Sequence, residues 1–136
     1  MKKFDELYAI ATRKSQYDQT NTWFKGVETY LEAIGKEVDE VREEIREDRL
    51  CHLEDELGDV LWNYLNVLKA LEREKGIDPE KVLERACTKY EQRVSAIESG
   101  RSWDEVKQQQ KQALNAEHES RAVRDHEEPI TARDII

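Results

Sequence analysis

Two stretches of the sequence place carboxylates at a spacing that suits metal binding. Glu37 and Glu40 stand three residues apart, and Glu56 and Asp59 repeat that spacing in the segment Glu-Leu-Gly-Asp. A helix turns by about 100° per residue, so side chains three positions apart lie on one face. Each stretch therefore predicts a narrow strip of oxygen ligands on one helix, and two such helices packed together would bring four carboxylates to one place.

A further oxygen-bearing side chain extends each strip, Glu44 in the first and Asn63 in the second. The plain alternative is that these are solvated faces of charged helices. Against it, four residues after Glu37 comes Val41, where a stabilising pair would place Lys or Arg. Crowded carboxylates at the edge of a core also repel one another unless a cation joins them. An all-oxygen ligand set favours Mg²⁺, with Mn²⁺ as a possible substitute.

The elements that must position these side chains are helices. The chain of 136 residues has five Gly and two Pro, and helix-forming residues dominate. Apolar residues recur at helical spacing, which predicts an all-α, antiparallel helical bundle. The expected helices span about residues 3–19, 23–46, 49–74, 79–99 and a shorter one from about 103 to 116. Thr22, Asp78 and Ser102 are the expected caps of three of these helices.

The third helix carries the strongest indication of assembly. Its main stripe runs from Leu53 through Leu57 and Tyr64, and further apolar side chains, such as Leu65, extend the apolar surface nearly all the way round. A helix that is apolar on all sides is buried on all sides. We therefore expect the helix to lie at the centre of a dimer or larger assembly.

Charge and composition narrow the cellular setting. A formal net charge of −9 disfavours nucleic acid or an anionic membrane as the partner. Cys51 and Cys87 lie inside helical patterns, and we expect reduced, buried thiols in a cytoplasmic protein. The chain shows no signal-peptide core and no apolar run of transmembrane length. We expect one domain over residues 1–116 and a polar, mobile tail over residues 117–136, which contacts of Ile130, Ile135 and Ile136 would dock.

Basic side chains follow on the fourth and fifth helices. Lys89 and Arg93 form an i, i+4 pair on the flank that matches the acidic strips, and Trp103 and Lys107 repeat the spacing. Each pair alone is better interpreted as ordinary surface residues. Together with the acidic strips, they predict a site for a metal ion and a polyphosphate.

These motifs together resemble the MazG-type nucleoside triphosphate pyrophosphohydrolases of the all-α pyrophosphatase superfamily. The resemblance rests on the two carboxylate pairs, on Lys89 and Arg93 in a Lys-Tyr-x-x-Arg-Val element, and on the pair of Trp103 and Lys107, and it covers about residues 23–107. It implies a four-helix core completed by dimerisation, as a homodimer or a dimer of dimers. Longer MazG proteins repeat the domain in tandem, whereas this chain holds one copy, so we expect a compact member with its own substrate preference.

The resemblance also implies an activity and roles for the residues. The activity is Mg²⁺-dependent hydrolysis of a (d)NTP to the (d)NMP and pyrophosphate, with housecleaning of the nucleotide pool as the role. The metal ligands would be Glu37, Glu40, Glu56 and Asp59, and either Glu37 or Glu40 would act as the general base. Lys89 and Arg93 would stabilise the phosphates and the leaving group. The remaining candidates for substrate contacts are Trp23, Phe24, Asn63, Trp103 and Lys107.

Two rival interpretations stay open. Within the same class, the chain would be a narrow-specificity hydrolase of dUTP, dCTP or phosphoribosyl-ATP. From another class, it would be a non-catalytic helical interaction module that binds through the third helix and leaves its carboxylates solvated. Turnover across a nucleotide panel separates these alternatives.

Overall fold

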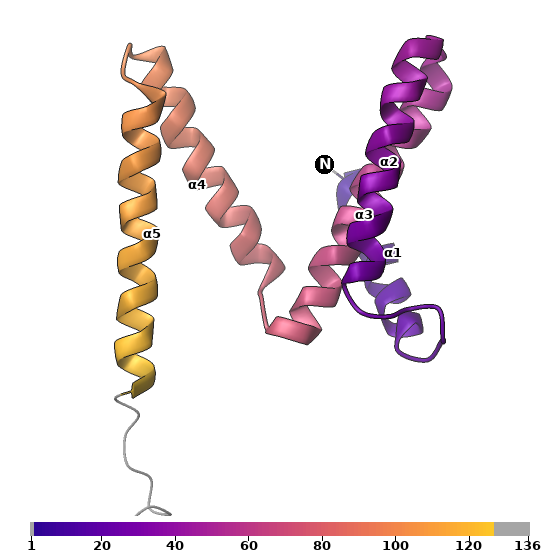
Figure 1. The fold of residues 1–136 in the computed structure, drawn as a ribbon, viewed down its shortest axis with the longest axis horizontal. Helices are drawn as coiled ribbons and strands as arrows, with labels where there is room; N and C mark the ends of the chain where they lie inside the picture. The colour runs from indigo at the N-terminus through magenta and orange to yellow at the C-terminus, as the bar shows by residue number, and fades with distance from the viewer. Residues whose placement is uncertain (1, 127–136) are drawn as a thin grey trace, which may run out of the picture. The chain divides into compact units, whose positions relative to one another are not determined.

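The computed structural model describes residues 2–126, and its side chains through Arg124. Every regular element in this range is a helix, which confirms the all-α prediction (Figure 1). The helices are α1 (Lys2–Asp18), α2 (Glu28–Glu47), α3 (Leu50–Lys75), α4 (Pro79–Glu98) and α5 (Trp103–His126). The chain forms two compact units, residues 1–82 and 83–136, and each is described by itself.

The helices end where local backbone chemistry ends them. Asp48, with a φ of 55°, adopts the left-handed conformation, and its N–H bonds to the carbonyl of Glu44, which closes α2. Gly76, with a φ of 71°, ends α3 in the same conformation. The side chain of Asp78 accepts from the N–H of Glu80 at 2.9 Å and starts α4 as predicted. Since only Asp48 and Arg49 separate α2 from α3, the two helices return antiparallel along one another.

The prediction that α2 begins at residue 23 with Thr22 as its cap is wrong. The side-chain oxygen of Asn21 instead accepts from the N–H groups of Trp23 and Phe24, both at 3.0 Å, and holds a turn. Gly26 then takes a φ of 91°, which is incompatible with a continuous helix. The helix therefore begins at Glu28.

The prediction that the fifth helix ends near residue 116 is also wrong. α5 continues to His126, so residues 117–126 of the expected tail are helical. Good helix formers and an ion pair between Arg85 and Glu117, at 2.7 Å, support this extension. The expected contacts of the three isoleucines fall outside the described residues.

In the first unit, α1 and α2 each pack against α3. The buried core consists of Ala11, Leu65 and Leu68, with partly buried side chains from α1, α3 and the start of α4 around it. The core thus lies on the face of α3 that packs against α1. Leu57 and Tyr64, which the sequence placed in the main buried stripe, are 51% and 40% exposed in the single chain.

The second unit joins α4 to α5 through polar contacts. Gln110 donates to the backbone carbonyl of Lys89 at 2.9 Å and accepts from Nε of Arg93 at 2.8 Å. Ala96 and Val106 are buried in this unit. The hydrogen bond to Gln110 thereby holds the charged side chain of Arg93 in place.

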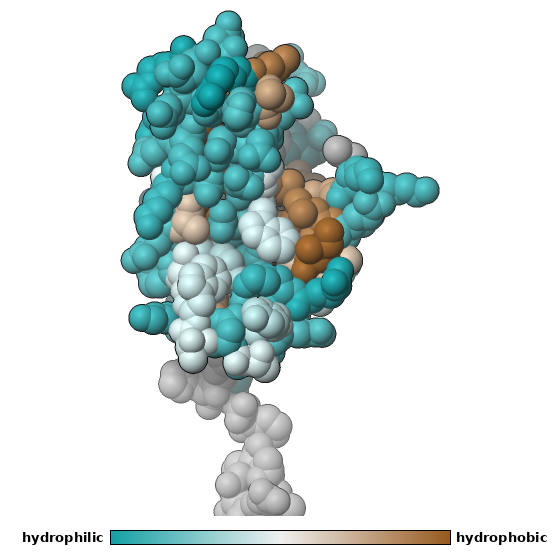
Figure 2. All heavy atoms as spheres, turned by 90° about the vertical axis from the view of Figure 1, so that its right-hand side faces the viewer, coloured by the Kyte–Doolittle hydropathy of each residue, from teal (hydrophilic) through white to brown (hydrophobic). Residues whose placement is uncertain are grey.

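Several large apolar side chains remain on the surface of the chain. Figure 2 shows hydrophobic patches on an otherwise largely hydrophilic face. The exposed set includes Leu31 and Ile45 on α2, Leu57 and Tyr64 on α3, and Leu83, Tyr90, Val94 and Ile97 on α4.

The structure also bears on the expected burial of the two cysteines and on the expected absence of a membrane-spanning helix. Cys51 and Cys87 are free but exposed, so the prediction of burial is wrong: each lies on a solvent-facing side of its helix in the single chain. Within the described range, no helix combines the length and apolarity that a membrane crossing requires.

Candidate metal and nucleotide site

Three of the four predicted carboxylates come together between α2 and α3. Glu37, Glu56 and Asp59 each offer an oxygen, and these three oxygens all lie within 4.8 Å of one another. The antiparallel return of α3 along α2 brings the two strips face to face. All three side chains are partly buried. The arrangement is a compact set of hard oxygen donors, as the sequence predicted.

Glu40 lies at the edge of this trio. It is exposed, but its carboxylate is close enough to Glu37 and Glu56 to hydrogen-bond with either when one partner is protonated. The structure therefore separates the four predicted ligands into three clustered carboxylates and one peripheral carboxylate.

Electrostatics show how unfavourable this cluster is by itself. Burial, hydrogen bonding with Glu56 and Glu40, and the negative charges nearby raise the pKa of Glu37 to about 8. A hydrogen bond with Glu37 lowers the pKa of Glu56, but its contact with Glu40, burial and the neighbouring charges outweigh this and raise it. Burial, followed by the charges of Asp55 and Glu40, raises the pKa of Asp59. A bound cation would reverse these effects.

Two oxygens of the cluster have no partner in the protein. With the carboxylates ionised, Oε2 of Glu37 and Oε2 of Glu56 are both buried, and neither receives a hydrogen bond. Only a proton on one of the carboxyl groups would let it donate to a neighbour. A buried carboxylate oxygen without a donor is costly. Oxygens without donors, on residues that gather carboxylate oxygens within 4.8 Å, match the ligand requirements of a divalent cation such as Mg²⁺ or Mn²⁺.

Neither of the two side chains that extend the strips joins the cluster. Glu44 is buried and bonds in bidentate fashion to Arg49, with Nε of Arg49 donating at 3.0 Å. Asn63 is buried, and its amide donates to the backbone carbonyl of Asp59 at 2.9 Å. Glu44 is therefore neutralised within the protein, and the donor end of Asn63 is already committed to its own helix.

The predicted basic and aromatic residues of the second unit form a cluster of their own. The guanidinium of Arg93 lies 5.4 Å from the ring of Tyr90 and 5.3 Å from the ring of Trp103. Lys89 is exposed, with its ammonium 5.6 Å from the ring of Tyr90. Lys107 is exposed on α5. The predicted grouping of Lys89, Arg93 and Trp103 is thus present within this unit.

Trp23 lies in the first unit, beside a network that the sequence did not reveal. It is 58% exposed, meets Tyr30 edge-on at 5.9 Å, and has the ammonium of Lys14 4.8 Å from its ring. Lys14 and the hydroxyl of Tyr30 both donate to Asp18, which is 3% exposed. Burial, the hydrogen bond to Asp18 and the charge of Asp18 raise the pKa of Tyr30, which keeps the phenol protonated.

Comparison with known proteins gives one match. The family model of the MazG nucleotide pyrophosphohydrolase domain matches residues 25–97, more than half of the chain. The matched range contains the four carboxylates together with Lys89 and Arg93, whereas Trp103 and Lys107 lie beyond it. No curated protein and no solved structure matches the chain significantly.

Proposed function

Because this chain belongs to the MazG nucleotide pyrophosphohydrolase family, we propose that it hydrolyses nucleoside triphosphates to the monophosphate and pyrophosphate with Mg²⁺ as cofactor. One observation supports this proposal most directly. Within the matched range, three carboxylate oxygens lie within 4.8 Å of one another, and two buried oxygens of the same residues have no hydrogen-bond partner. Such a cluster is costly without a cation and well suited to holding one.

The roles of the residues follow from their placement. Glu37, Glu56 and Asp59 would hold the ion, and Glu40 would complete its environment from the edge. Bound Mg²⁺ would screen the phosphate charges and lower the pKa of a water that attacks the α-phosphorus. Glu40 is the better candidate for the general base, because it is exposed and lies outside the trio, so an oxygen remains available for the proton of the water.

Lys89 and Arg93 would stabilise the negative charge that develops on the phosphate oxygens and on the departing pyrophosphate. The exposed ammonium of Lys89 is free to adjust to a ligand. Arg93 is held between two rings and bonded to Gln110, so it would act as a fixed charge. Trp23, Phe24, Asn63, Trp103 and Lys107 remain candidates for further substrate contacts.

The exposed apolar side chains support assembly as part of the same proposal. Leu57 and Tyr64 on α3, and Tyr90 and Ile97 on α4, are each at least 40% exposed in the single chain. Burying such side chains stabilises an assembly by about 25 cal/mol per Å² of apolar surface. We propose a homodimer, or a dimer of dimers, that covers them, and light scattering on the purified protein measures its mass.

The deciding experiment is turnover. Purified protein is incubated with each common dNTP and NTP, and with phosphoribosyl-ATP, in Mg²⁺ or Mn²⁺, and pyrophosphate release is measured. We expect release from at least one nucleotide, and turnover of dUTP, dCTP or phosphoribosyl-ATP alone would indicate the narrow-specificity alternative. Glu56→Gln should abolish release while the helical circular dichroism persists. Glu54→Gln, an exposed position on the same helix, is the matched control.

A panel that yields no pyrophosphate would favour the interaction module instead. That interpretation predicts that Mg²⁺ with a non-hydrolysable dNTP leaves the thermal unfolding midpoint unchanged, because a ligand that does not bind cannot stabilise the folded state.

A further inference from the structure

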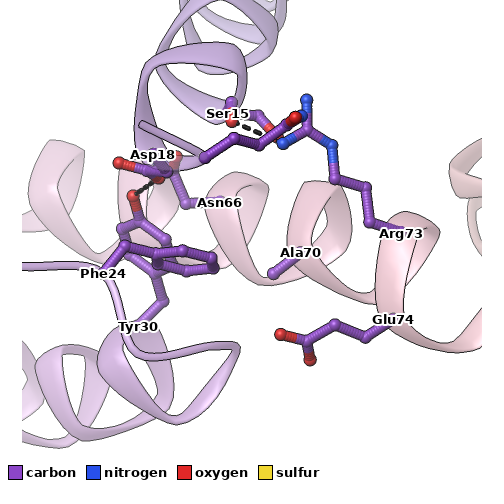
Figure 3. Close-up of a pocket in the computed structure, with 9 residues that line it drawn as sticks. Ser15, Asp18, Phe24, Tyr30, Asn66, Ala70, Arg73 and Glu74 are labelled. Atoms are coloured by element: carbon purple, nitrogen blue, oxygen red, sulfur yellow. Dashed lines mark hydrogen bonds between the residues drawn. The ribbon is translucent and has the colours of Figure 1, made fainter. Parts of the chain in front are cut away.

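A second polar feature of the first unit lies apart from the carboxylates. A partly open cavity of about 120 Å³ is bordered by the end of α1, the segment before α2, the start of α2 and the second half of α3 (Figure 3). Phe24, Tyr30, Asn66, Ala70 and Arg73 are among the residues that line it. This cavity is smaller than an engineered apolar cavity of about 150 Å³ that binds benzene, so it has room for one six-membered ring at most and none for a fused purine.

The charged groups around this cavity already have partners. Asp18 accepts from the hydroxyl of Tyr30, as the dashed line in Figure 3 marks. Arg73 donates to the backbone carbonyl of Ser15 at 2.7 Å, and Glu74 accepts from the N–H of Val27 at 3.1 Å. These groups therefore shape the wall and leave little unsatisfied polarity for a ligand.

Asn66 differs from its neighbours in the wall. Its side chain is 1% exposed, and its amide nitrogen donates to the backbone carbonyl of Trp62 at 2.8 Å. That bond fixes the amide orientation and leaves Oδ1, which has no hydrogen-bond partner. A buried acceptor without a donor costs about 1–3 kcal/mol. The wall of the cavity, to which Phe24 also contributes, thus contains one buried acceptor without a donor.

The position of the cavity relates it to the carboxylate cluster. Tyr30 lies seven residues before Glu37 on α2, and Asn66 lies seven residues after Asp59 on α3. Seven residues make about two helical turns, or about 10 Å, and return to the same face of the helix. Cavity and carboxylates therefore follow one another along the same side of the α2–α3 pair, separated by a length that a sugar and a base can span.

We propose that this cavity receives a pyrimidine base of the nucleotide and that Oδ1 of Asn66 accepts a hydrogen bond from an N–H donor on that base. The proposal rests on the proposed function, because it treats the carboxylates as the phosphate end of the same site. The donor is either the exocyclic amine of cytosine or the ring imide of uracil or thymine. Asn66 is a specificity-determining residue in this arrangement, with Phe24 packing against the ring.

Binding of monophosphates tests the proposal without turnover. Titration calorimetry in Mg²⁺ compares dCMP, dUMP, dAMP and dGMP. It then compares dUMP with its N3-methyl analogue, and dCMP with the 2-pyrimidinone analogue that lacks the amine. We expect a pyrimidine to bind more tightly than either purine. For that pyrimidine, loss of the donor should weaken binding about 10- to 100-fold, since the buried acceptor is then left unpaired.

Variants of residues in the wall test whether the cavity causes this difference between donor-bearing and donor-lacking analogues. Asn66→Ala should bind the donor-bearing and donor-lacking analogues equally. Ala70→Leu, which fills a wall position that is 4% exposed, should lose pyrimidine binding, whereas Ala113→Leu on the exposed surface of α5 should not. Thermal unfolding of each variant checks folding, and Ala70→Leu keeps the test decisive if Asn66→Ala fails to fold.

The outcomes separate the two proposals. Binding of a pyrimidine through Asn66 without any pyrophosphate release would support the cavity and refute the hydrolase. Hydrolysis with the same base discrimination in Asn66→Ala, tighter binding of a purine, or undiminished binding by Ala70→Leu would overturn the cavity proposal alone. Absence of binding by every monophosphate would overturn it as well.

Discussion

Replacing Glu37 by Gln should stabilise the metal-free protein while removing its response to Mg²⁺. Glu37 is the carboxylate whose pKa is raised to about 8 by burial and by its acidic neighbours, from an ordinary value of 4.5. Ionising it in the folded protein is therefore unfavourable at neutral pH. Gln keeps the shape of the side chain and removes the charge, so the metal-free cluster loses one source of repulsion.

The magnitude and its pH dependence follow from linkage. A group whose pKa is higher in the folded protein contributes stability at low pH and loses that contribution as pH rises through the folded pKa. The wild type should therefore become less stable between about pH 4.5 and 8. One pKa unit corresponds to about 1.4 kcal/mol, so the interval from the ordinary pKa of 4.5 to pH 7 sets an upper limit of about 3.5 kcal/mol. Water screens this partly exposed cluster, so we expect a gain of about 1–2 kcal/mol for Glu37→Gln.

Urea denaturation in EDTA, repeated at several values between pH 5 and pH 9, measures this effect. Glu37→Gln should exceed the wild type in free energy of unfolding most clearly at high pH, and Glu32→Gln, an exposed position on the same helix, should not. Added Mg²⁺ should stabilise the wild type at pH 8 and leave Glu37→Gln nearly unchanged. Equal stability of the metal-free proteins, or equal protection by Mg²⁺, would refute this account of the cluster.

Three further predictions concern other parts of the chain. Glu44→Ala should lower the free energy of unfolding by about 1 kcal/mol in urea denaturation, because the partly exposed ion pair with Arg49 is lost. If the variant also lost the stabilisation by added Mg²⁺, Glu44 would instead be a metal ligand. Tyr30→Phe removes a donor from buried Asp18 and should cost about 1–2 kcal/mol by the same measurement, whereas an unchanged value would mean that Lys14 satisfies Asp18 alone. Lys89→Met should reduce pyrophosphate release about 10- to 100-fold and leave the unfolding midpoint unchanged, because Lys89 is exposed; full activity would remove it from the site.

The sequence predicted the helices and the meeting of the carboxylates because both depend on local periodicity. A spacing of three residues fixes a helix face, and the short connection at Asp48 and Arg49 fixes the antiparallel return. The start of α2 escaped prediction because Asn21 and Gly26 impose a turn that the apolar pattern does not register. The length of α5 escaped it because residues 117–126 form a helix without an apolar stripe.

The location of the core and the second polar site required the structure. α3 is apolar on nearly every side, so periodicity could not show that Leu65 and Leu68 face α1 while Leu57 does not. The one signal for Asn66 was a polar residue inside the apolar run Leu65–Leu68. Whether its acceptor oxygen is satisfied depends on neighbours far away in the sequence, which no local pattern specifies.

The contrast between Glu44 and Glu37 is the strongest physical argument for a cation in the cluster. Both are acidic side chains of α2, seven residues apart; Glu44 is buried and Glu37 is partly buried. The protein neutralises Glu44 with Arg49, yet it leaves Oε2 of Glu37 buried without a donor and places Glu56 and Asp59 beside it. With 22 Lys and Arg residues in the chain, positive charge is available to neutralise carboxylates. A cluster that lacks this compensation pays a stability cost unless something outside the chain supplies the charge, and a divalent cation does so with the fewest groups.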